Sequence, residues 1–247
     1  MTKANNVILI KIIELKKKHP AWGYRRVHAY LKYRLGFEIN HKRVYRLMKA
    51  HNLLVPKNKR LRAKRTIKTT KPRTVIPNRV WGMDMTKTKI SHFGWAYIHI
   101  VLDWGSKKIV GWQVNHQSKT RDWLDALHNA VNEQFPDGYR EKEKPLMLVT
   151  DNGCQPSSYA FKKQCSKMGL HQIFTSFCNP KGNADTERVI RTMKEDLIWI
   201  NEWDSFEHLK EAIEDWVKDY NLDFPHSSLK QMTPYEYEKN FNDYYAI

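Results

Sequence analysis

Three carboxylates in this sequence stand where an acidic side chain calls for a chemical explanation. Asp84 lies in the alternating stretch VWGMDMTKTKI, and Asp151 directly follows the apolar run LMLVT. Glu187 stands in NADTERVIRTMKED, with 35 residues between it and Asp151. An acid flanked by Trp and Met is costly in a strand unless it meets a cation or a metal ion. We therefore interpret the three as parts of one charged site.

Carboxylates of this kind suit one class of chemistry. Mg²⁺ prefers hard oxygen ligands and keeps room for water and substrate phosphate. Two such ions, about 3.5–4 Å apart, activate an attacking hydroxyl and stabilise the leaving oxygen in an in-line displacement at phosphorus. We predict Asp84, Asp151 and Glu187 to be catalytic and to bind Mg²⁺, as two ions, with Mn²⁺ able to substitute.

The elements that must position these residues can be read from the surrounding pattern. Residues 146–149 form an apolar run typical of a buried strand, and the Asn-Gly that follows Asp151 indicates a turn. Polar residues at the carboxyl ends of strands in open α/β sheets often line a ligand crevice. After a right-handed crossover, this strand could lie beside the strand that carries Asp84. Glu187 would stand in the first turns of a long helix.

The order of elements after residue 79 predicts an α/β fold with a mixed sheet and helices on both faces. Strands are predicted at VWGMDMTKTKI, on either side of the Asp-Trp-Gly-Ser turn, before Asp151 and at HQIFTS. Helices are predicted at residues 120–135, 157–168, 185–199 and 206–220, and PHSSLKQMTPYEY is predicted to be a capped or irregular tail.

Cationic residues follow Glu187 along its helix. Arg191 comes four residues later and Lys194 seven, which at roughly 100° per residue places both on the face of Glu187. We predict that Arg188, Arg191 and Lys194 contact DNA. Ordinary ion pairs on the helix surface, such as Glu187 with Arg191, are an equally good explanation of this helix taken alone.

Charge is distributed very unevenly along the chain, whose formal net charge is +17. Residues 1–79 hold 23 of the 43 Lys and Arg but two of the 26 acids. Clustering on this scale favours a nucleic-acid-binding segment over a general aid to solubility. A helix is predicted over residues 5–18. Two further short helices around Leu35-Gly36-Phe37 form a helix-turn-helix candidate, with Asn40 as N-cap of the second.

The second of these helices presents a basic face, and we predict Arg43, Arg46 and Lys49 to contact DNA. The complete division predicted from the sequence comprises four segments. They are a helix-turn-helix DNA-binding region (1–55), a basic linker (56–78), a catalytic core (79–202) and a C-terminal helical extension (203–247).

Other reactive residues have simpler explanations. Asp103 suits hairpin chemistry and Asp185 suits a helix N-cap or first turn. The histidines at 116, 171 and 226 are expected to be structural or DNA-contacting. Cys154, Cys165 and Cys178 lack zinc-finger or disulfide spacing and are expected to be reduced thiols. Because no apolar run reaches the roughly 18 residues of a membrane span and no signal peptide is evident, a cytoplasmic location without membrane contact is expected.

Together these motifs resemble a known family. VWGMDMT, LVTDNG, the 35-residue interval and NADTERVIRTMKED resemble the DDE transposases of bacterial insertion sequences, specifically the second-frame product (OrfB) of the IS-three family, and more distantly retroviral integrases. WGYRRVHAYL and NHKRVYRLMKAHNLL resemble the helix-turn-helix segment of that family. VLDWGSKKIVGW resembles its second and third strands, and YNLDFPHSSLKQMTPYEY its C-terminal signature. The resemblance covers most of residues 20–238.

The resemblance implies an RNase H-like core, Mg²⁺ dependence and a catalytic triad at Asp84, Asp151 and Glu187. Lys194 matches the basic residue that the family places seven positions after the glutamate. The implied reaction is hydrolysis at the 3′ end of a mobile element, followed by attack of the freed 3′ hydroxyl on another phosphodiester. The loop KGNADTE departs from the family pattern, because Asp185 adds an acid before Glu187.

Partners also follow from the resemblance. They are double-stranded DNA, as element ends and target, and an upstream OrfA-type DNA-binding protein, often joined by a frameshift. Holding two ends together implies a homo-oligomer on DNA, and DNA binding implies association with the nucleoid. Two alternatives stay open. One is a structure-selective RNase H-like nuclease, and the other is a non-catalytic DNA-binding regulator of transposition or a host-adopted relic.

Overall fold

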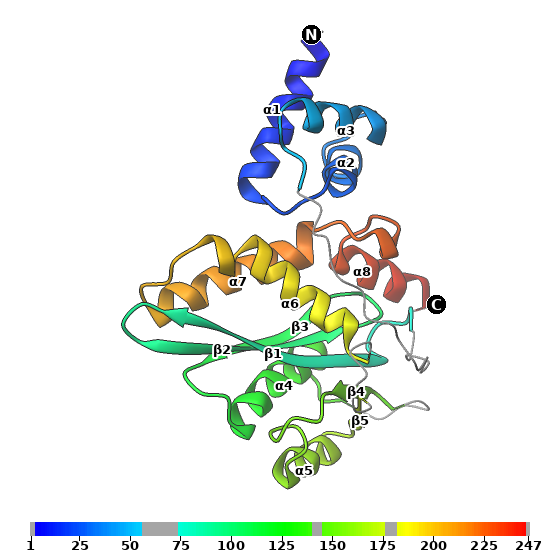
Figure 1. Cartoon of the computed structure of the whole chain (residues 1–247). Helices are drawn as coiled ribbons and strands as arrows, with labels where there is room; N and C mark the ends of the chain where they lie inside the picture. The colour runs from blue at the N-terminus through cyan, green and yellow to red at the C-terminus, as the bar shows by residue number, and fades with distance from the viewer. Residues whose placement is uncertain (1–2, 56–73, 140–144, 176–181, 246–247) are drawn as a thin grey trace, which may run out of the picture. The chain divides into compact units, whose positions relative to one another are not determined.

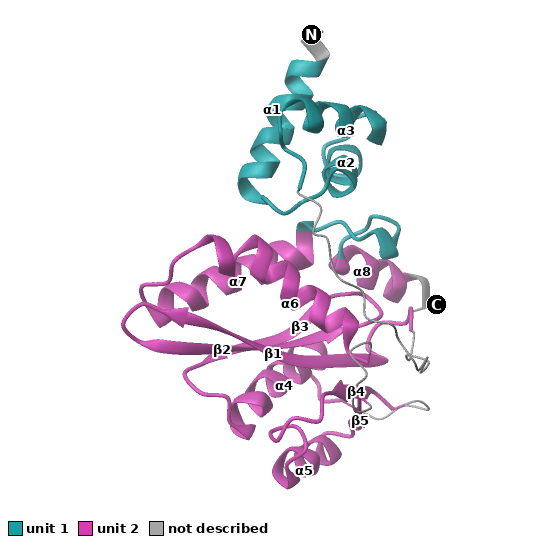
Figure 2. Ribbon diagram, viewed as in Figure 1, with its two compact units in different colours: residues 1–68, 223–233 teal, residues 69–222, 234–247 magenta. Residues whose placement is uncertain are grey.

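The computed structural model describes residues 3–55, 74–139, 145–175 and 182–245. The chain divides into two compact units, coloured separately in Figure 2. The first comprises residues 1–68 with 223–233, and the second comprises residues 69–222 with 234–247. Each unit therefore contains a segment from the C-terminal part of the chain. The four-segment division predicted from the sequence stays a prediction.

The second unit is built on one five-stranded mixed sheet with the strand order β3-β2-β1-β4-β5. β1 pairs antiparallel with β2 and parallel with β4, so it is the central strand. All five strands predicted from the sequence are present, in the mixed arrangement predicted. Their bounds are β1 Val80–Ile90, β2 Gly94–Asp103, β3 Ile109–Asn115, β4 Met147–Thr150 and β5 His171–Phe174.

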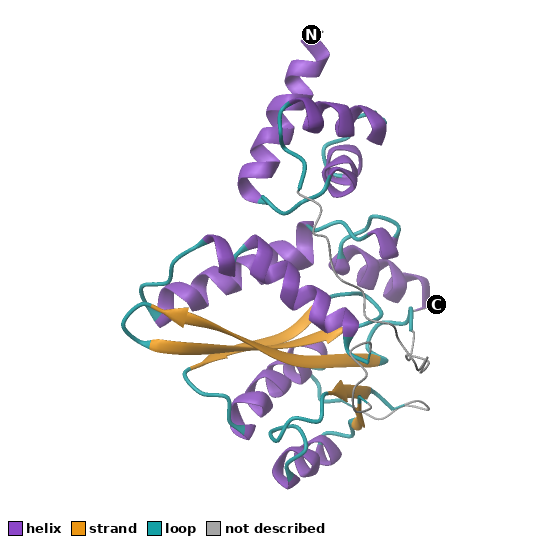
Figure 3. Ribbon diagram, viewed as in Figure 1, coloured by secondary structure: helices purple, strands orange, loops and turns teal. Residues whose placement is uncertain are grey.

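Helices cover both faces of this sheet, as predicted. In Figure 1, α6 (Ala184–Asp196) and α7 (Phe206–Asp223) lie on one side of the strands, and α4 (Thr120–Gln134) and α5 (Tyr159–Lys167) on the other. Figure 3 shows the same layers by secondary structure. The two layers use opposite faces of β1, because alternate side chains of a strand point to opposite sides.

The face of β1 that meets α4 and α5 is apolar. Trp81 and Met83 are fully buried in a core shared with Trp123 of α4 and Phe161 of α5. Val80, Gly82 and Asp84 alternate with them and so belong to the opposite face, where α6 packs. The alternation that identified the strand thus also separates its structural face from its charged one.

Two predicted elements differ in the structure. The helix predicted to reach Trp199 ends at Asp196, because Leu197 departs from helical geometry (φ −132°, ψ −60°), and a 3₁₀ turn, η1 Ile198–Ile200, follows. The tail predicted to be capped or irregular contains a regular helix, α8 Pro234–Tyr245. Proline is well suited to the first helical position, since its missing N–H has no intrahelical acceptor there.

The first unit contains α1 Lys3–Lys18, α2 Tyr24–Tyr33 and α3 His41–Ala50, so the predicted helix-turn-helix pair is present. The predicted N-cap is confirmed, because Asn40 Oδ1 accepts the backbone N–H of Lys42 at 2.8 Å. Gly36 in the intervening turn has φ +67°, a left-handed conformation that favours glycine.

Residues 223–233 complete this first unit. The ring of Phe224 meets Trp22 edge-on at 5.0 Å between centroids, and both side chains are buried. Tyr30 donates a hydrogen bond to Asp223 Oδ2 at 2.7 Å. The helix-turn-helix unit therefore draws part of its core from a segment nearly two hundred residues away in the sequence.

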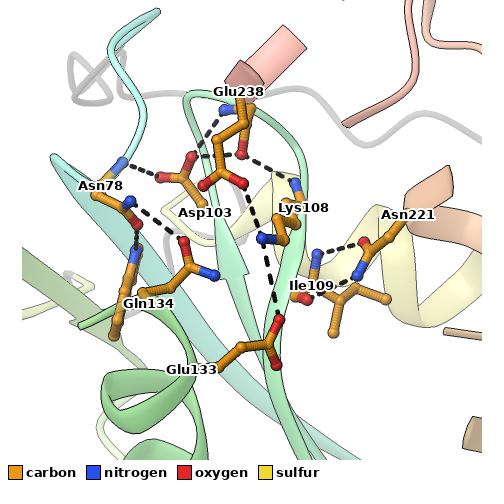
Figure 4. A network of polar contacts seen from close by, with 10 residues as sticks. Asn78, Asp103, Lys108, Ile109, Glu133, Gln134, Asn221 and Glu238 are labelled. Atoms are coloured by element: carbon orange, nitrogen blue, oxygen red, sulfur yellow. Dashed lines mark hydrogen bonds and ion pairs between the residues drawn. The ribbon is translucent and has the colours of Figure 1, made fainter. Parts of the chain in front are cut away.

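A polar network ties α8 and α7 to the turn between β2 and β3 (Figure 4). Lys108 forms ion pairs with Glu238 at 2.7 Å and with Glu133 at 3.9 Å. Asn221 of α7 accepts the N–H of Ile109 and donates to its carbonyl, both at 2.9 Å. Burial raises the pKa of Glu133, and the Lys108 charge opposes that shift. One cation thus pairs with a buried carboxylate, Glu238, and with an exposed one, Glu133.

Replacing Lys108 by Met should lower the free energy of unfolding by about 2–3 kcal/mol, because it leaves the buried Glu238 without its cation while keeping the aliphatic stem. Urea unfolding followed by tryptophan fluorescence measures this. Arg121→Met is the matched control, since Arg121 pairs with Asp125 at 4.0 Å on the exposed surface and should cost less than about 0.5 kcal/mol. Equal losses in the two variants would contradict this account of the network.

Candidate active site

Asp84 and Asp151 are carried by neighbouring parallel strands. The register pairs Val80 with Met147 and Gly82 with Val149. Two residues further along each strand are Asp84 and Asp151, at the point where β4 ends. β4 therefore lies beside β1 in the sheet, as expected from the sequence.

Asp84 is a partly desolvated carboxylate. It is half-buried, and its Oδ1 accepts the N–H of Met85 at 2.7 Å. Burial is the main reason that its pKa is raised, to about 6, and the charges of Asp151 and Glu187 raise it further. The Met85 N–H and the charge of Lys194 act in the opposite direction without cancelling the shift. Asp84 therefore interacts electrostatically with both of the other predicted acids.

Asp151 is exposed and is oriented by its own turn. Its Oδ1 accepts the N–H of Gly153 at 3.0 Å, the short-range bond by which an Asp side chain stabilises a turn. The Thr175 N–H donates to the Thr150 carbonyl at 2.9 Å, which continues the β4–β5 pairing beside it. The turn predicted from Asn-Gly is therefore present and presents the carboxylate at the strand end.

Glu187 lies in the first turn of α6, and its side chain is exposed. Its N–H donates to the Asn183 carbonyl at 3.0 Å. The buried side chain of Asn183 donates to the carbonyl of Met83 at 3.0 Å, one residue before Asp84. Sequence reasoning missed Asn183 because an Asn in a Gly- and Asn-containing loop suggests only a turn. Its amide attaches the helix start to the central strand.

The three acids are close enough to influence one another but are not gathered as ligands. Within residues 3–55, 74–139, 145–175 and 182–245, no three His, Cys, Asp or Glu side chains converge closely enough to hold a metal ion. The donor set itself, carboxylates from three separate elements, has the chemistry of a site for a hard divalent cation. Burial keeps the pKa of Asp84 raised even though the charge of Lys194 acts in the opposite direction.

The basic residues predicted on α6 have different surroundings. Arg188 is exposed. Arg191 forms an ion pair with Glu195 at 2.6 Å, so its partner on this helix is the acid four residues later rather than the one four residues earlier. Lys194 is half-buried, and its charge acts on Asp84. Of the three, Lys194 is the residue whose charge the structure connects with the acids.

The predicted DNA contacts of α3 also differ from one another. Arg43 is half-buried and donates from Nε and Nη2 to Asn5 Oδ1, at 2.9 and 2.6 Å. Arg46 and Lys49 are exposed. Arg43 therefore links α3 to α1, whereas Arg46 and Lys49 present their charges to solvent.

The competing acids have the structural roles expected. Asp103 is fully buried and accepts hydrogen bonds from the N–H and hydroxyl of Ser106, at 2.8 and 2.6 Å. Burial nevertheless raises its pKa to about 6. Asp185 lies in the first turn of α6, after its N-cap Asn183, and pairs with Lys107 at 3.6 Å.

The remaining reactive side chains are dispersed. The ring of His116 stacks on Phe206 at 4.0 Å, and His171 is exposed on β5. His226 lies in the other unit, 5.4 Å from the Phe224 ring. Cys165 is a buried thiol, and its burial raises its pKa to about 12. Cys154 is an exposed thiol. Cys178, also expected to be a reduced thiol, lies outside the described residues.

Family models match nearly the whole chain. Two models described as "Integrase core domain" match residues 75–180 and 168–234, and one described as "HTH-like domain" matches residues 3–60. The chain belongs to the integrase core family. A curated relative of this integrase core protein is the Escherichia coli transposase InsD for insertion element IS2. The two are 26% identical over 239 residues, which are 93% of this chain and 77% of the relative.

Solved structures agree with this family at the level of the fold. The simian T-cell lymphotropic virus intasome in complex with a PP2A regulatory subunit contains a chain of TM-score 0.58 and 15% identity, covering 92% of this protein and 74% of that chain. The HTLV-2 integrase catalytic core in complex with magnesium has a TM-score of 0.51 and 18% identity, covering 67% and 99%. The RNase H-like fold expected for the integrase core is thus confirmed. No helix in the described part of the chain is long and apolar enough to cross a membrane.

Replacing Asp84 by Asn should stabilise the metal-free protein at pH 8 by about 1–2 kcal/mol, after allowance for partial solvent screening. The folded-state pKa of Asp84, about 6, lies above the ordinary value for Asp of 3.8, so ionisation costs wild-type stability as the pH rises through that window. Asn keeps an acceptor for the Met85 N–H and does not ionise.

Urea unfolding in the presence of EDTA, at pH 4, 6 and 8, measures this difference. The advantage of Asp84→Asn should be largest at pH 8 and should vanish towards pH 4, where both side chains are neutral. An advantage that is independent of pH would show that the charge of Asp84 is not its cause.

Proposed function

We propose that this protein is the catalytic subunit of an insertion-element transposase, which cleaves DNA at the 3′ ends of the element and joins them to a target. One observation carries the proposal above all. The pKa of Asp84 is raised by burial and by Asp151 and Glu187 together, so three elements of an integrase core bring three acids into one electrostatic unit. The relative named transposase InsD, aligned over most of the chain, supports the same assignment.

The chemistry of the three acids suits a divalent cation, and binding one would require them to come closer together than they stand in this structure. Asp84, Asp151 and Glu187 would hold it, and the chemistry of three carboxylates favours Mg²⁺, or Mn²⁺ in its place. Two such ions supply Lewis acidity and a lowered pKa for the attacking hydroxyl or water when bound. The magnesium-bound HTLV-2 integrase core supports use of this metal, and the number of ions is our proposal.

The protein's own residues prepare the site for an anionic substrate. Burial, and to a lesser extent the charges of Asp151 and Glu187, disfavour the ionised form of Asp84 in the free protein, so a cation bound at the site would stabilise that form. Lys194 lies near enough to act on Asp84, and we assign it to the phosphodiester backbone beside the acids. Arg188 is exposed one residue after Glu187 and extends this basic surface.

The reaction proposed is phosphoryl transfer in two steps. Water first attacks the phosphorus at the element end, a new P–O bond forms, and the bond to the 3′ oxygen breaks. The freed 3′ hydroxyl then attacks a target phosphodiester, and one P–O bond replaces another. The first step replaces the P–O bond to the 3′ carbon's oxygen by a bond to the oxygen of water, and the second step exchanges one phosphodiester for another. In both steps the catalytic task is positioning and charge neutralisation.

DNA recognition is assigned to the HTH-like unit. On α3, the exposed Arg46 and Lys49 are placed to reach phosphates or a groove. Arg43 keeps its contact with Asn5 and orients the helix. The proposed partners are double-stranded DNA, an upstream OrfA-type protein and further copies of this chain on DNA. The intasome neighbour supports the last of these by analogy.

Asp151→Asn should abolish cleavage and strand transfer on labelled DNA carrying the element ends, in Mg²⁺ and in Mn²⁺, with a loss of at least about a hundredfold. Binding to the same DNA should change less than about threefold, because Asn retains the shape and the turn-forming oxygen. The rates come from gel analysis of products, and the affinities from fluorescence anisotropy.

Asp137→Asn is a control that removes the same charge from the turn after α4, outside the triad. If wild type joins DNA and Asp151→Asn does so equally well, Asp151 has no catalytic role. If wild type binds DNA but is inert in either metal, both alone and fused to its upstream partner, the binding-protein alternative is favoured.

Arg46→Ala should weaken binding to specific and nonspecific duplexes by a similar factor, and should reduce the slope of log affinity against log salt by about one. Titrations between 50 and 200 mM salt measure this slope. Lys11→Ala is the comparison, because Lys11 pairs with Glu14 at 2.8 Å on α1 and should leave the slope unchanged. An unchanged slope in Arg46→Ala would remove Arg46 from the phosphate contacts.

A further inference from the structure

Gly82 lies two residues before Asp84 and allows α6 to approach the central strand very closely. A Cβ at this position would lie 2.2 Å from Thr186 Oγ1, 2.3 Å from Trp104 Nε1 and 2.7 Å from Asn183 Oδ1. These distances are far shorter than a Cβ contact, so any side chain would force its neighbours apart. The first turn of α6 therefore rests directly on the backbone of β1.

A hydrogen bond crosses this close approach. Trp104 Nε1 donates to Thr186 Oγ1 at 3.2 Å, and the two residues are 1% and 0% exposed. The backbone N–H of Trp104 donates to the carbonyl of Val80 at 2.9 Å, which fixes the indole to the start of β1. The preceding residue, Asp103, holds the turn through Ser106. The indole thus joins the turn after β2 to the start of α6.

Thr186 immediately precedes Glu187 on this helix. Successive helical residues differ by roughly 100°, so Thr186 can face inward while Glu187 remains exposed. Any shift of Thr186 along or away from β1 moves Glu187 with it. The separation of Glu187 from Asp84 therefore depends on how the first turn of α6 seats over Gly82.

We infer that Gly82, Trp104 and Thr186 form a positioning device for the metal site, in which the Trp104–Thr186 hydrogen bond fixes where Glu187 stands relative to Asp84. This inference rests on the proposed function. None of the three is a metal ligand or a reacting group. They act through α6, and the Asn183 bond to Met83 holds the same helix turn from its other side.

A directed polar bond suits this role better than an apolar contact. The indole N–H is a donor only, and a buried donor without an acceptor costs on the order of 1–3 kcal/mol. The bond therefore penalises displacements that plain packing would tolerate. A site that must hold three like charges at defined separations needs such a restraint, because their repulsion pushes the elements apart.

Thr186→Val tests the device, since it keeps the β-branched shape and removes the acceptor. Thr186→Ser should restore it. Thr192→Val is the matched control, because Thr192 lies on the same helix and its hydroxyl donates to the Arg188 carbonyl at 3.0 Å on the exposed side. Four properties are measured for each variant: strand-transfer rate, Mn²⁺ affinity by calorimetry, DNA affinity and melting temperature.

In Thr186→Val we expect a rate about tenfold lower and a Mn²⁺ affinity several-fold weaker, with DNA affinity and folded fraction as in wild type. Thr186→Ser and Thr192→Val should stay within about twofold of wild type in strand-transfer rate, Mn²⁺ affinity and DNA affinity, with a melting temperature close to that of wild type. The inference is overturned if Thr186→Val keeps wild-type rate and Mn²⁺ affinity. It is also overturned if its losses match those of Thr192→Val or are accounted for by unfolded protein.

A second pair of variants separates positioning from general damage. Gly82→Ala forces a Cβ against α6, whereas Gly111→Ala forces one against Ala130 Cβ of α4 at 2.5 Å. Both should lower the melting temperature, but only Gly82→Ala should weaken Mn²⁺ affinity beyond that loss. Equal Mn²⁺ affinity in the two overturns the inference. A wild type that binds Mn²⁺ yet never cleaves or joins DNA contradicts the proposed function instead, and leaves the affinity comparison interpretable.

Discussion

Repulsion among three carboxylates is the interaction on which the arrangement of the catalytic unit depends. Asp84, Asp151 and Glu187 come from a central strand, the end of its parallel neighbour and the first turn of a helix. Burial raises the pKa of Asp84, and the charges of Asp151 and Glu187 raise it further. Nothing local to any of these elements favours such an approach. The sheet register, the turn after Thr150 and the seating of α6 must together hold against it, and the apolar core under Trp81 and Met83 supplies the rigid side.

The helix α6 shows how one element meets opposing requirements. Its inward side carries buried residues, including Thr186 and Val189, which dock the helix on the sheet. Its outer side begins with Glu187, which contributes negative charge, and continues to Lys194, whose positive charge acts on the same strand acid. Acids in the first turn also interact favourably with the helix dipole. The helix can therefore bring a carboxylate to a negative site and extend a cationic surface away from it.

Strong periodicity made most elements predictable from the sequence. The alternation of VWGMDMTKTKI identified β1 and its two faces, and Asn40 marked the start of α3. Other features depend on contacts between distant segments, which local patterns do not record. From the sequence, Asn183 suggests a loop residue and Thr186 a residue on a helix surface, yet both are buried. Asn183 contacts β1, and Thr186 contacts Trp104 in the turn after β2. Likewise, nothing local in residues 223–233 indicates that Phe224 packs on Trp22.

The acids described in this structure differ in how their charge is compensated. Glu238 faces Lys108, Asp185 faces Lys107 and Glu195 faces Arg191, so these three acids each have a cation at short range. The buried Asp103 instead accepts hydrogen bonds from Ser106. Asp84 instead accepts a backbone N–H, and the charge of Lys194 leaves its pKa above the usual range. Positive charge within the chain therefore offsets the burial of Asp84 only in part. Positive charge from outside the chain would therefore stabilise the site more than it would stabilise any of the paired acids.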